Sequence, residues 1–150
     1  MKTIKKIICP VDVYDFQPEA AEYAATLAKA LDARIFVMHV MEPVPTPYVG
    51  EGYTVSMSDH KKNEERVKQE AEEKLAEIIA RFGGDCQVDG EVILGRAADK
   101  ILQVSEERAG DMVIMASHGR SFWGRAIHGS VTNRVIANAK IPVLVINPVG

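Results

Sequence analysis

The sequence MVIMASHGRSFWGRAIHGSVT, residues 112–132, contains the pattern that decides the fold. It begins with the apolar run Met112–Ala116, whose β-branched residues are typical of a strand buried on both faces. Small and polar residues follow, and Gly129-Ser130 then opens a segment with apolar residues at helical spacing. The stretch therefore predicts a strand, a loop that contains glycines, and the start of a helix.

The junction between this loop and the helix is a candidate anion site. We interpret Ser130 as the N-cap, because its hydroxyl can accept a hydrogen bond from a first-turn N–H group. Backbone N–H groups and the positive end of the helix then point at one spot, which favours an anion such as phosphate. Arg120 and Arg125 add positive charge to the loop. A surface loop whose glycines serve only turn geometry stays the alternative, since the stretch contains neither a Walker loop nor G-x-G-x-x-G.

The rest of the chain alternates between strand and helix patterns. This alternation predicts an α/β fold of parallel βαβ units, with an open sheet that carries helices on both faces, in one domain over residues 1–150. Residues 41–58, rich in proline and glycine, are either a functional lid or a disordered crossover. We expect strands over residues 4–11, 34–40, 88–94, 112–116 and 143–146, and helices over residues 20–31, 59–82, 98–109 and from Ser130.

Composition narrows the class of protein. The chain has 150 residues and a net charge of −3, so no broad basic field suggests a nucleic-acid partner. No apolar run approaches the roughly 20 residues of a membrane span, and the N-terminus has the pattern of a strand and not of a signal peptide. Cys9 and Cys86 form no C-x-x-C motif, which indicates buried or idle thiols in a reducing compartment. We therefore predict a cytoplasmic protein.

A few polar residues near strand ends could carry chemistry. Asp12 and Asp15 follow the first predicted strand, where a carboxylate can contact a ribose hydroxyl, lie near a metal or cap the next helix; for Asp15 we prefer the cap. We interpret His39, alone in an apolar strand, as a hydrogen-bonded core or rim residue. Ser117 and His118 are a weak nucleophile–base pair, because adjacent residues at a strand end point apart. The sequence shows no G-x-S-x-G elbow and no cluster of metal ligands, so we predict no catalytic residues and no protein-held metal.

The opening stretch resembles the nucleotide loop of the universal stress protein family. ATP-binding members carry Gly, two residues, Gly, nine residues and then Gly-Ser or Gly-Thr. This chain has Ala116, two residues, Gly119, nine residues and then Gly129-Ser130, so that alanine replaces the first glycine. The valine and threonine that follow, and the terminal PVLVINP, are also similar to the family. The resemblance extends over essentially the whole chain.

The resemblance implies a Rossmann-like, adenine nucleotide alpha hydrolase-like fold with strand order 3-2-1-4-5. Ligands of such sheets bind where the strand order reverses, here between strands one and four. The resemblance further implies ATP as ligand, with Asp12 at the ribose, the backbone near Val40 at the adenine, and Mg²⁺ or Mn²⁺ held mainly by phosphates and water. The predicted nucleotide-binding residues are Pro10, Val11, Asp12, Val40, Ala116, Ser117, His118, Gly119, Arg120, Gly129, Ser130, Val131 and Thr132.

The resemblance also implies a biological role and an assembly. The role is that of an ATP-binding module in stress response or signalling. Val143–Ile146 is an apolar strand at the edge of the expected sheet, so a homodimer through this strand is expected. Two alternatives stay open: a nucleotide-independent dimeric regulatory module, and a slow ATP hydrolase that uses the same crevice. Rapid turnover would require groups matched to the transition state, and no clear general base stands out.

Overall fold

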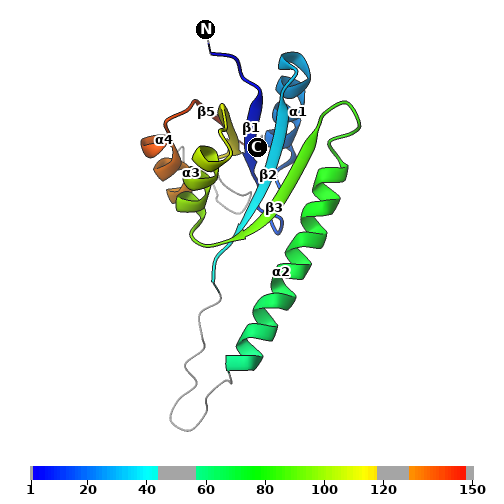
Figure 1. Cartoon of the computed structure of the whole chain (residues 1–150), viewed down its shortest axis with the longest axis vertical. Coiled ribbons are helices and arrows are strands. Elements are labelled where there is room, and N and C mark those ends of the chain that lie inside the picture. The colour runs from blue at the N-terminus through cyan, green and yellow to red at the C-terminus, as the bar shows by residue number, and fades with distance from the viewer. Residues whose placement is uncertain (1, 44–56, 118–128, 148–150) are drawn as a thin grey trace.

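The computed structural model describes residues 2–43, 57–117 and 129–147. These residues form a five-stranded parallel sheet in the order β3-β2-β1-β4-β5, with helices on both faces (Figure 1). The predicted fold class and strand order are confirmed. The elements are β1 (Lys6–Pro10), α1 (Pro18–Leu31), β2 (Arg34–Met41), α2 (Met57–Ala80), β3 (Val88–Leu94), α3 (Ala97–Glu107), β4 (Met112–Ala116), α4 (Ser130–Asn138) and β5 (Val143–Ile146).

The bounds of β1, β2, α1, α2 and α3 depart from the expected ones by one or two residues. β3, β4 and β5 have the expected bounds, whereas β1 is shorter than residues 4–11 and β2 extends to Met41. α1 begins at Pro18 and not at Ala20, because proline, which has a fixed φ and no N–H, suits the first position of a helix. α2 begins and ends two residues earlier than expected. Residues 44–56 of the irregular segment lie outside the described residues.

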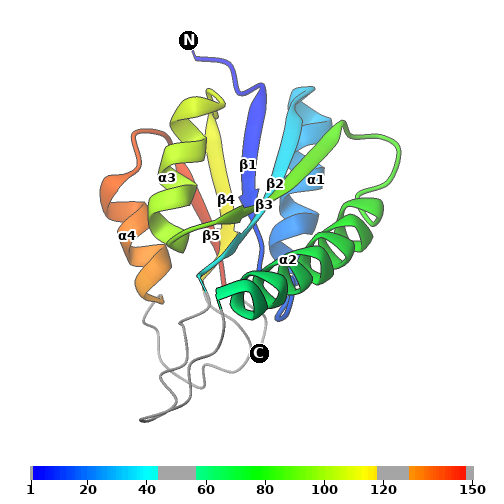
Figure 2. The same cartoon turned by 60° about the horizontal axis from the view of Figure 1, so that its bottom comes forward.

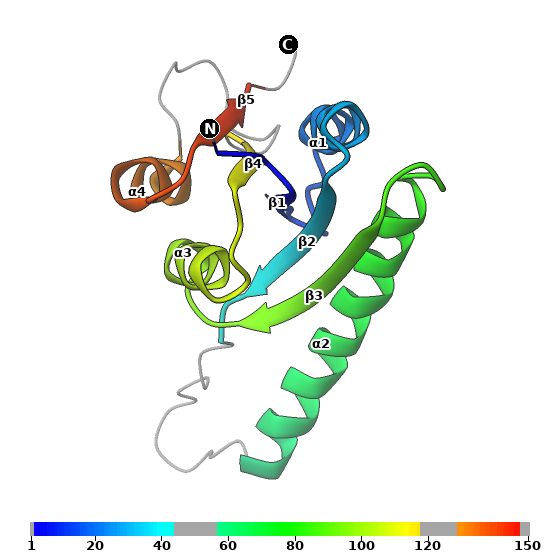
Figure 3. The same cartoon turned by 45° about the horizontal axis from the view of Figure 1, so that its top comes forward.

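Each face of the sheet has its own apolar core. α1 and α2 cover one face, and α3 and α4 cover the other (Figure 3). Successive strand residues point to opposite faces, so Ile7 and Cys9 of β1 pack towards α1 and α2, and Ile8 packs with the α3 and α4 side. The central strand is therefore buried on both faces. The same holds for β4, with Ile114 in one core and Val113 in the other, which confirms the burial predicted from its apolar run.

Both cysteines are free thiols. Cys9 is fully buried in β1, and burial raises its pKa to about 12. A thiol that stays protonated at neutral pH is a poor nucleophile, so Cys9 acts as a small core residue, as predicted. Cys86 is half-buried.

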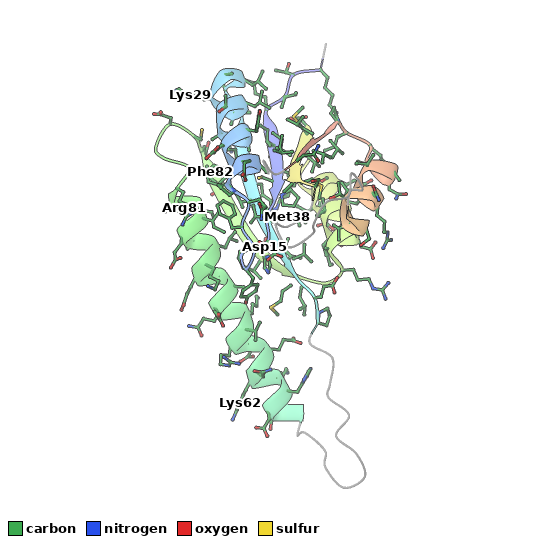
Figure 4. The ribbon with its side chains drawn as sticks, turned by 180° about the vertical axis from the view of Figure 1, so that it is seen from behind. Asp15, Lys29, Met38, Lys62, Arg81 and Phe82 are labelled. Atoms are coloured by element: carbon green, nitrogen blue, oxygen red, sulfur yellow. The ribbon has the colours of Figure 1, made fainter. Side chains whose placement is uncertain are left out.

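Helix α2 is the longest element and only its second half is covered. Its buried residues Ala71, Leu75 and Ile78 pack on the sheet, whereas the end that contains Lys62 projects beyond the sheet (Figure 4). Arg81 and Phe82, which follow α2, lie at the opposite end, beside the sheet (Figure 4). In the described part of the chain, no helix has the length and apolar character needed to cross a membrane.

Candidate functional site

The strands β1, β2 and β4 end at the same edge of the sheet (Figure 2). A pocket opens at this edge. It lies between β1 and β4, where the strand order reverses, which is the usual ligand position in open parallel sheets. Its volume is about 710 Å³. It is lined by Pro10, Val11, Asp12, Asp15, Gln17, Ala20, Met38, His39, Val40, Ala97, Ile101, Met115, Ala116, Ser117, Gly129, Ser130, Val131, Thr132 and Asn133.

Most of the predicted nucleotide-binding residues line this pocket. The pocket includes Pro10, Val11, Asp12, Val40, Ala116, Ser117, Gly129, Ser130, Val131 and Thr132. Three predicted residues, His118, Gly119 and Arg120, lie outside the described residues, as does Arg125. That these residues contact a nucleotide stays a prediction.

The β4–α4 junction, formed by Ser117 and residues 129–132, is held together by hydrogen bonds to one carbonyl. The Ser117 carbonyl oxygen accepts a hydrogen bond from the Gly129 N–H (3.2 Å) and another from Thr132 Oγ1 (2.9 Å). Ser117 and Thr132 are both buried. These bonds bring the end of β4 against the first turn of α4.

The interpretation of Ser130 as N-cap is wrong. The N-cap is Gly129, without a side-chain cap, and Ser130 is the first residue of α4. The capping residue lies one position earlier because Gly129 has the extended conformation of an N-cap, with φ −59° and ψ 161°. First-turn N–H groups have no carbonyl partner within the helix, so the start of α4 remains suited to an anion.

The β1–α1 loop, residues 11–17, brings two carboxylates to the pocket. Asp12 Oδ1 accepts a hydrogen bond from the Tyr14 N–H (2.9 Å), and Asp15 Oδ1 accepts one from Gln17 Nε2 (3.2 Å). The prediction that Asp15 caps the next helix is wrong, since the N-cap of α1 is Gln17 and it has no side-chain cap bond. Helix α1 starts later than a cap at Asp15 would require, because Pro18 takes its first position.

His39 ties the β1–α1 loop to β2. Its Nδ1 lies 3.3 Å from the Val13 amide nitrogen and 3.2 Å from the Val11 carbonyl oxygen. Either tautomer therefore bonds to the loop backbone, by accepting from Val13 or by donating to Val11. His39 is buried, which confirms its interpretation as a hydrogen-bonded core residue.

Helix α2 supports the same loop from the other side. Lys74 Nζ lies 5.9 Å from the centre of the Tyr14 ring, and the Arg81 guanidinium lies 5.7 Å from the centre of the Phe16 ring. Burial, together with the negative charges of Glu70 and Asp12, raises the pKa of Tyr14.

An apolar wall completes the pocket, and most of it was not predicted. The wall consists of apolar residues from three elements: Met38 and Val40 of β2, Met115 of β4, and Ala97 and Ile101 of α3. Apolar side chains of this kind suit a flat aromatic ring. The strand residues could have been found from alternation, because Met38 and Val40 share a face, but nothing in the sequence ties α3 to the site. Figure 4 shows Met38 and Asp15 at the end of the sheet, where the apolar and acidic parts meet.

The side chains present offer little to a metal on their own. Across residues 2–43, 57–117 and 129–147, no group of three or more His, Cys, Asp or Glu side chains could hold a metal ion. A divalent ion in this pocket would need ligands from a bound molecule, such as phosphate oxygens.

The fold and the pocket define the class of protein: an α/β protein with a ligand pocket at the strand-order switch of a parallel sheet. A family model described as the universal stress protein family matches residues 3–147. A universal stress protein of Methanocaldococcus jannaschii is 34% identical over 145 residues, which cover 95% of this chain and 81% of that protein. The chain belongs to the universal stress protein family.

Solved structures agree with this assignment. A second universal stress protein of Methanocaldococcus jannaschii, studied as a hypothetical protein whose biochemical function was assigned from its structure, has a TM-score of 0.78 at 25% identity over 99% of both chains. A universal stress protein in complex with cAMP has a TM-score of 0.63 at 17% identity, and the match covers 99% of this chain and 100% of that one. The second likeness concerns the fold alone.

Proposed function

We propose that the protein binds an adenine nucleotide, ATP, in this pocket and acts as a stress-response or signalling module of the cytoplasm. The observation that carries the proposal is one pocket bounded by two carboxylate-bearing residues, Asp12 and Asp15, and by the start of α4. Carboxylates accept hydrogen bonds from hydroxyls, and a helix start attracts phosphate. A nucleotide carries both kinds of group.

The size and apolar wall of the pocket support the same ligand. Its volume of about 710 Å³ lies within the usual range for small-molecule sites. Val40 is half-buried in the lining and offers apolar surface for a base at the end of β2, with Met38 and Met115 buried beside it. Among solved relatives of this fold, one was determined in complex with cAMP, which supports an adenine nucleotide as the ligand class.

A divalent cation fits this proposal only through the ligand. Mg²⁺ keeps several waters and is commonly held by substrate phosphates with one or two carboxylates. We infer that Mg²⁺ or Mn²⁺ enters with ATP, and that Asp12 or Asp15 contributes at most a nearby charge.

The direct test is calorimetry of ATP with the wild type and Gly129→Val. The Gly129 conformation, φ −59° and ψ 161°, is open to valine, so the variant should fold while its side chain crowds the proposed phosphate position. We expect about a hundredfold loss of ATP affinity, equivalent to about 2.7 kcal/mol, and much less loss for adenosine.

The control is Gly84→Val, at a glycine where an added Cβ meets nothing within 4 Å and which lies outside the pocket. Its ATP affinity should equal that of the wild type. Unchanged ATP affinity in Gly129→Val would exclude the β4–α4 junction as the phosphate site. Mass spectrometry of molecules released on denaturation would show whether a nucleotide co-purifies.

We also propose a homodimer through β5. This strand is at the edge of the sheet, and all of its residues from Val143 to Ile146 are half-buried with no charge. An apolar edge strand is a template for pairing with another strand, and a two-fold axis would make that pairing antiparallel.

Light scattering on Val145→Lys tests the assembly. The charge should shift the protein towards monomer, because a lysine on an edge strand opposes strand pairing. Leu31→Lys, at an exposed leucine at the end of α1, is the matched control and should leave the mass unchanged. A monomeric wild type at tens of micromolar would contradict the dimer.

A further inference from the structure

Gln17 has a buried amide oxygen that lacks a hydrogen-bond donor. The residue is only 6% exposed and lies in the pocket lining next to Asp15. Its Nε2 donates a hydrogen bond to Asp15 Oδ1 (3.2 Å). Its Oε1 is buried, and no described residue donates a hydrogen bond to it. Buried polar atoms are normally paired, so an unpaired one in a pocket wall indicates a missing partner.

The Asp15 carboxylate determines which end of the amide is unpaired. Amide oxygen and nitrogen are assigned from their hydrogen bonds, since the two atoms look alike. A carboxylate only accepts hydrogen bonds, so the reverse orientation would place Oε1 against Asp15 Oδ1 without a proton between them. The unpaired atom of Gln17 is therefore an acceptor, and the partner that it lacks is a donor.

The side chain can present this acceptor to a ligand. The last torsion of glutamine is broad and soft, so a partial turn of the carboxamide costs little, whereas a half-turn would place Oε1 against Asp15 Oδ1. The second oxygen of the Asp15 carboxylate can keep Nε2 bonded during such a turn. The loop backbone need not move, since His39 holds it at Val11 and Val13.

We propose that Gln17 is a specificity-determining residue, whose Oε1 accepts a hydrogen bond from the nucleoside part of the bound nucleotide. This inference rests on the proposed nucleotide site. Phosphate oxygens have no protons to donate at neutral pH when ionised, and Asp15 repels them. The partner is therefore a ribose hydroxyl or the amine of the base. The acceptor thus orients the ligand, with the nucleoside at the β1–α1 loop and the phosphates at α4.

The experiment is a calorimetric cycle with Gln17→Met and nucleotide analogues. Methionine has a similar length and no acceptor of comparable strength. We expect Gln17→Met to bind ATP about tenfold more weakly than the wild type, and to bind the analogue that lacks the partner donor as well as the wild type does. The analogues are 2′-deoxy-ATP and 3′-deoxy-ATP, which each lack one ribose hydroxyl, and inosine triphosphate, which lacks the amine.

Two further variants test whether the loss of affinity comes from the Gln17 amide itself. Gln103→Met is the matched control: Gln103 is exposed on α3, and both ends of its amide are bonded, to Lys100 and Glu107. It should bind every nucleotide as the wild type does. Asp15→Asn removes the charge that orients the Gln17 amide and should reduce the discrimination between ATP and the sensitive analogue. This variant gives a second test if Gln17→Met does not fold.

The outcomes separate this inference from the proposed function. A wild type that binds no nucleotide overturns both. A wild type that binds ATP, with Gln17→Met binding it equally well, overturns only the role of Gln17. A tenfold loss that is the same for ATP and all three analogues also overturns it, because no donor is then coupled to Gln17. If Gln17→Met and the wild type bind a deoxy analogue equally well, the donor to Gln17 is the ribose hydroxyl that this analogue lacks. If they bind inosine triphosphate equally well, the donor is the amine of the base.

Discussion

The two loops that meet in the pocket are held in different ways. The β1–α1 loop is held by side chains from distant parts of the chain: His39 bonds to its backbone, and Lys74 and Arg81 of the α2 region lie over its aromatic rings. The β4–α4 junction is held by backbone bonds of Ser117: its carbonyl accepts two hydrogen bonds from the junction's own residues, and its N–H donates to the Ile146 carbonyl at the end of β5.

This difference shows where the site is vulnerable. A carbonyl that accepts two hydrogen bonds keeps one when the other is removed. The backbone of the β1–α1 loop depends on one ring nitrogen of His39, which either accepts from the Val13 N–H or donates to the Val11 carbonyl. A buried backbone group without a partner costs more than a lost bond to a group that stays paired. Changes that target the β1–α1 loop should therefore cost more than equivalent changes at the β4–α4 junction.

The largest effect is expected for His39→Leu. Leucine fills much of the volume but removes the ring nitrogen that bonds to Val13 or Val11, so a buried backbone group loses its partner and the free energy of unfolding should fall by about 2 kcal/mol. Urea denaturation measures the loss. His39→Asn, whose side-chain oxygen can accept the same hydrogen bond, should recover part of it. If His39→Leu is as stable as the wild type, the loop does not depend on this side chain.

A smaller effect is expected for Thr132→Val. The substitution keeps the shape and removes the hydroxyl that donates to Ser117, while the Gly129 N–H still donates to the same carbonyl. The free energy of unfolding should fall by about 1 kcal/mol, measured in the same way. Thr26→Val is the matched control, since the Thr26 hydroxyl bonds to the Glu22 carbonyl on an exposed face of α1 and its loss should have little effect. A loss at Thr132 larger than that at His39 would reverse the comparison.

The sequence predicted the strands of the fold more accurately than the starts of its helices. The apolar runs of β4 and β5 gave the bounds of these strands, because an uninterrupted apolar run shows the length of the strand directly. The bounds of β3 also matched, although most of its residues are exposed. Helix starts were predicted less accurately, because the position of a cap depends on the local backbone conformation. The N-caps of α1 and α4 are Gln17 and Gly129, whereas Asp15 and Ser130 were expected. A side-chain oxygen near a helix start indicates a cap but does not fix its position.

The site could be predicted where its residues follow a strand. Asp12 and Gly129 come from the loops after β1 and β4, and parallel strands bring such loops to one edge. Ala97 and Ile101 could not be found this way, because only the packing of α3 on the sheet brings them to the pocket. Gln17 carried no signal either, since its role depends on Asp15 and on burial.

The smallest effect, a change in the pKa of Tyr14, tests directly whether α2 supports the β1–α1 loop. Burial, then the charge of Glu70 on α2, then that of Asp12, raise this pKa, because each makes the negatively charged phenolate less favourable. Glu70→Gln removes a negative charge and should lower the pKa of Tyr14, and Asp12→Asn should lower it less. Alkaline absorbance titration, with Tyr14→Phe to identify the signal, measures both changes.

Glu72→Gln is the matched control, since Glu72 pairs with Lys68 along α2 and does not contribute to the pKa of Tyr14. Equal titration curves for Glu70→Gln and Glu72→Gln would mean that α2 does not lie against the loop in solution.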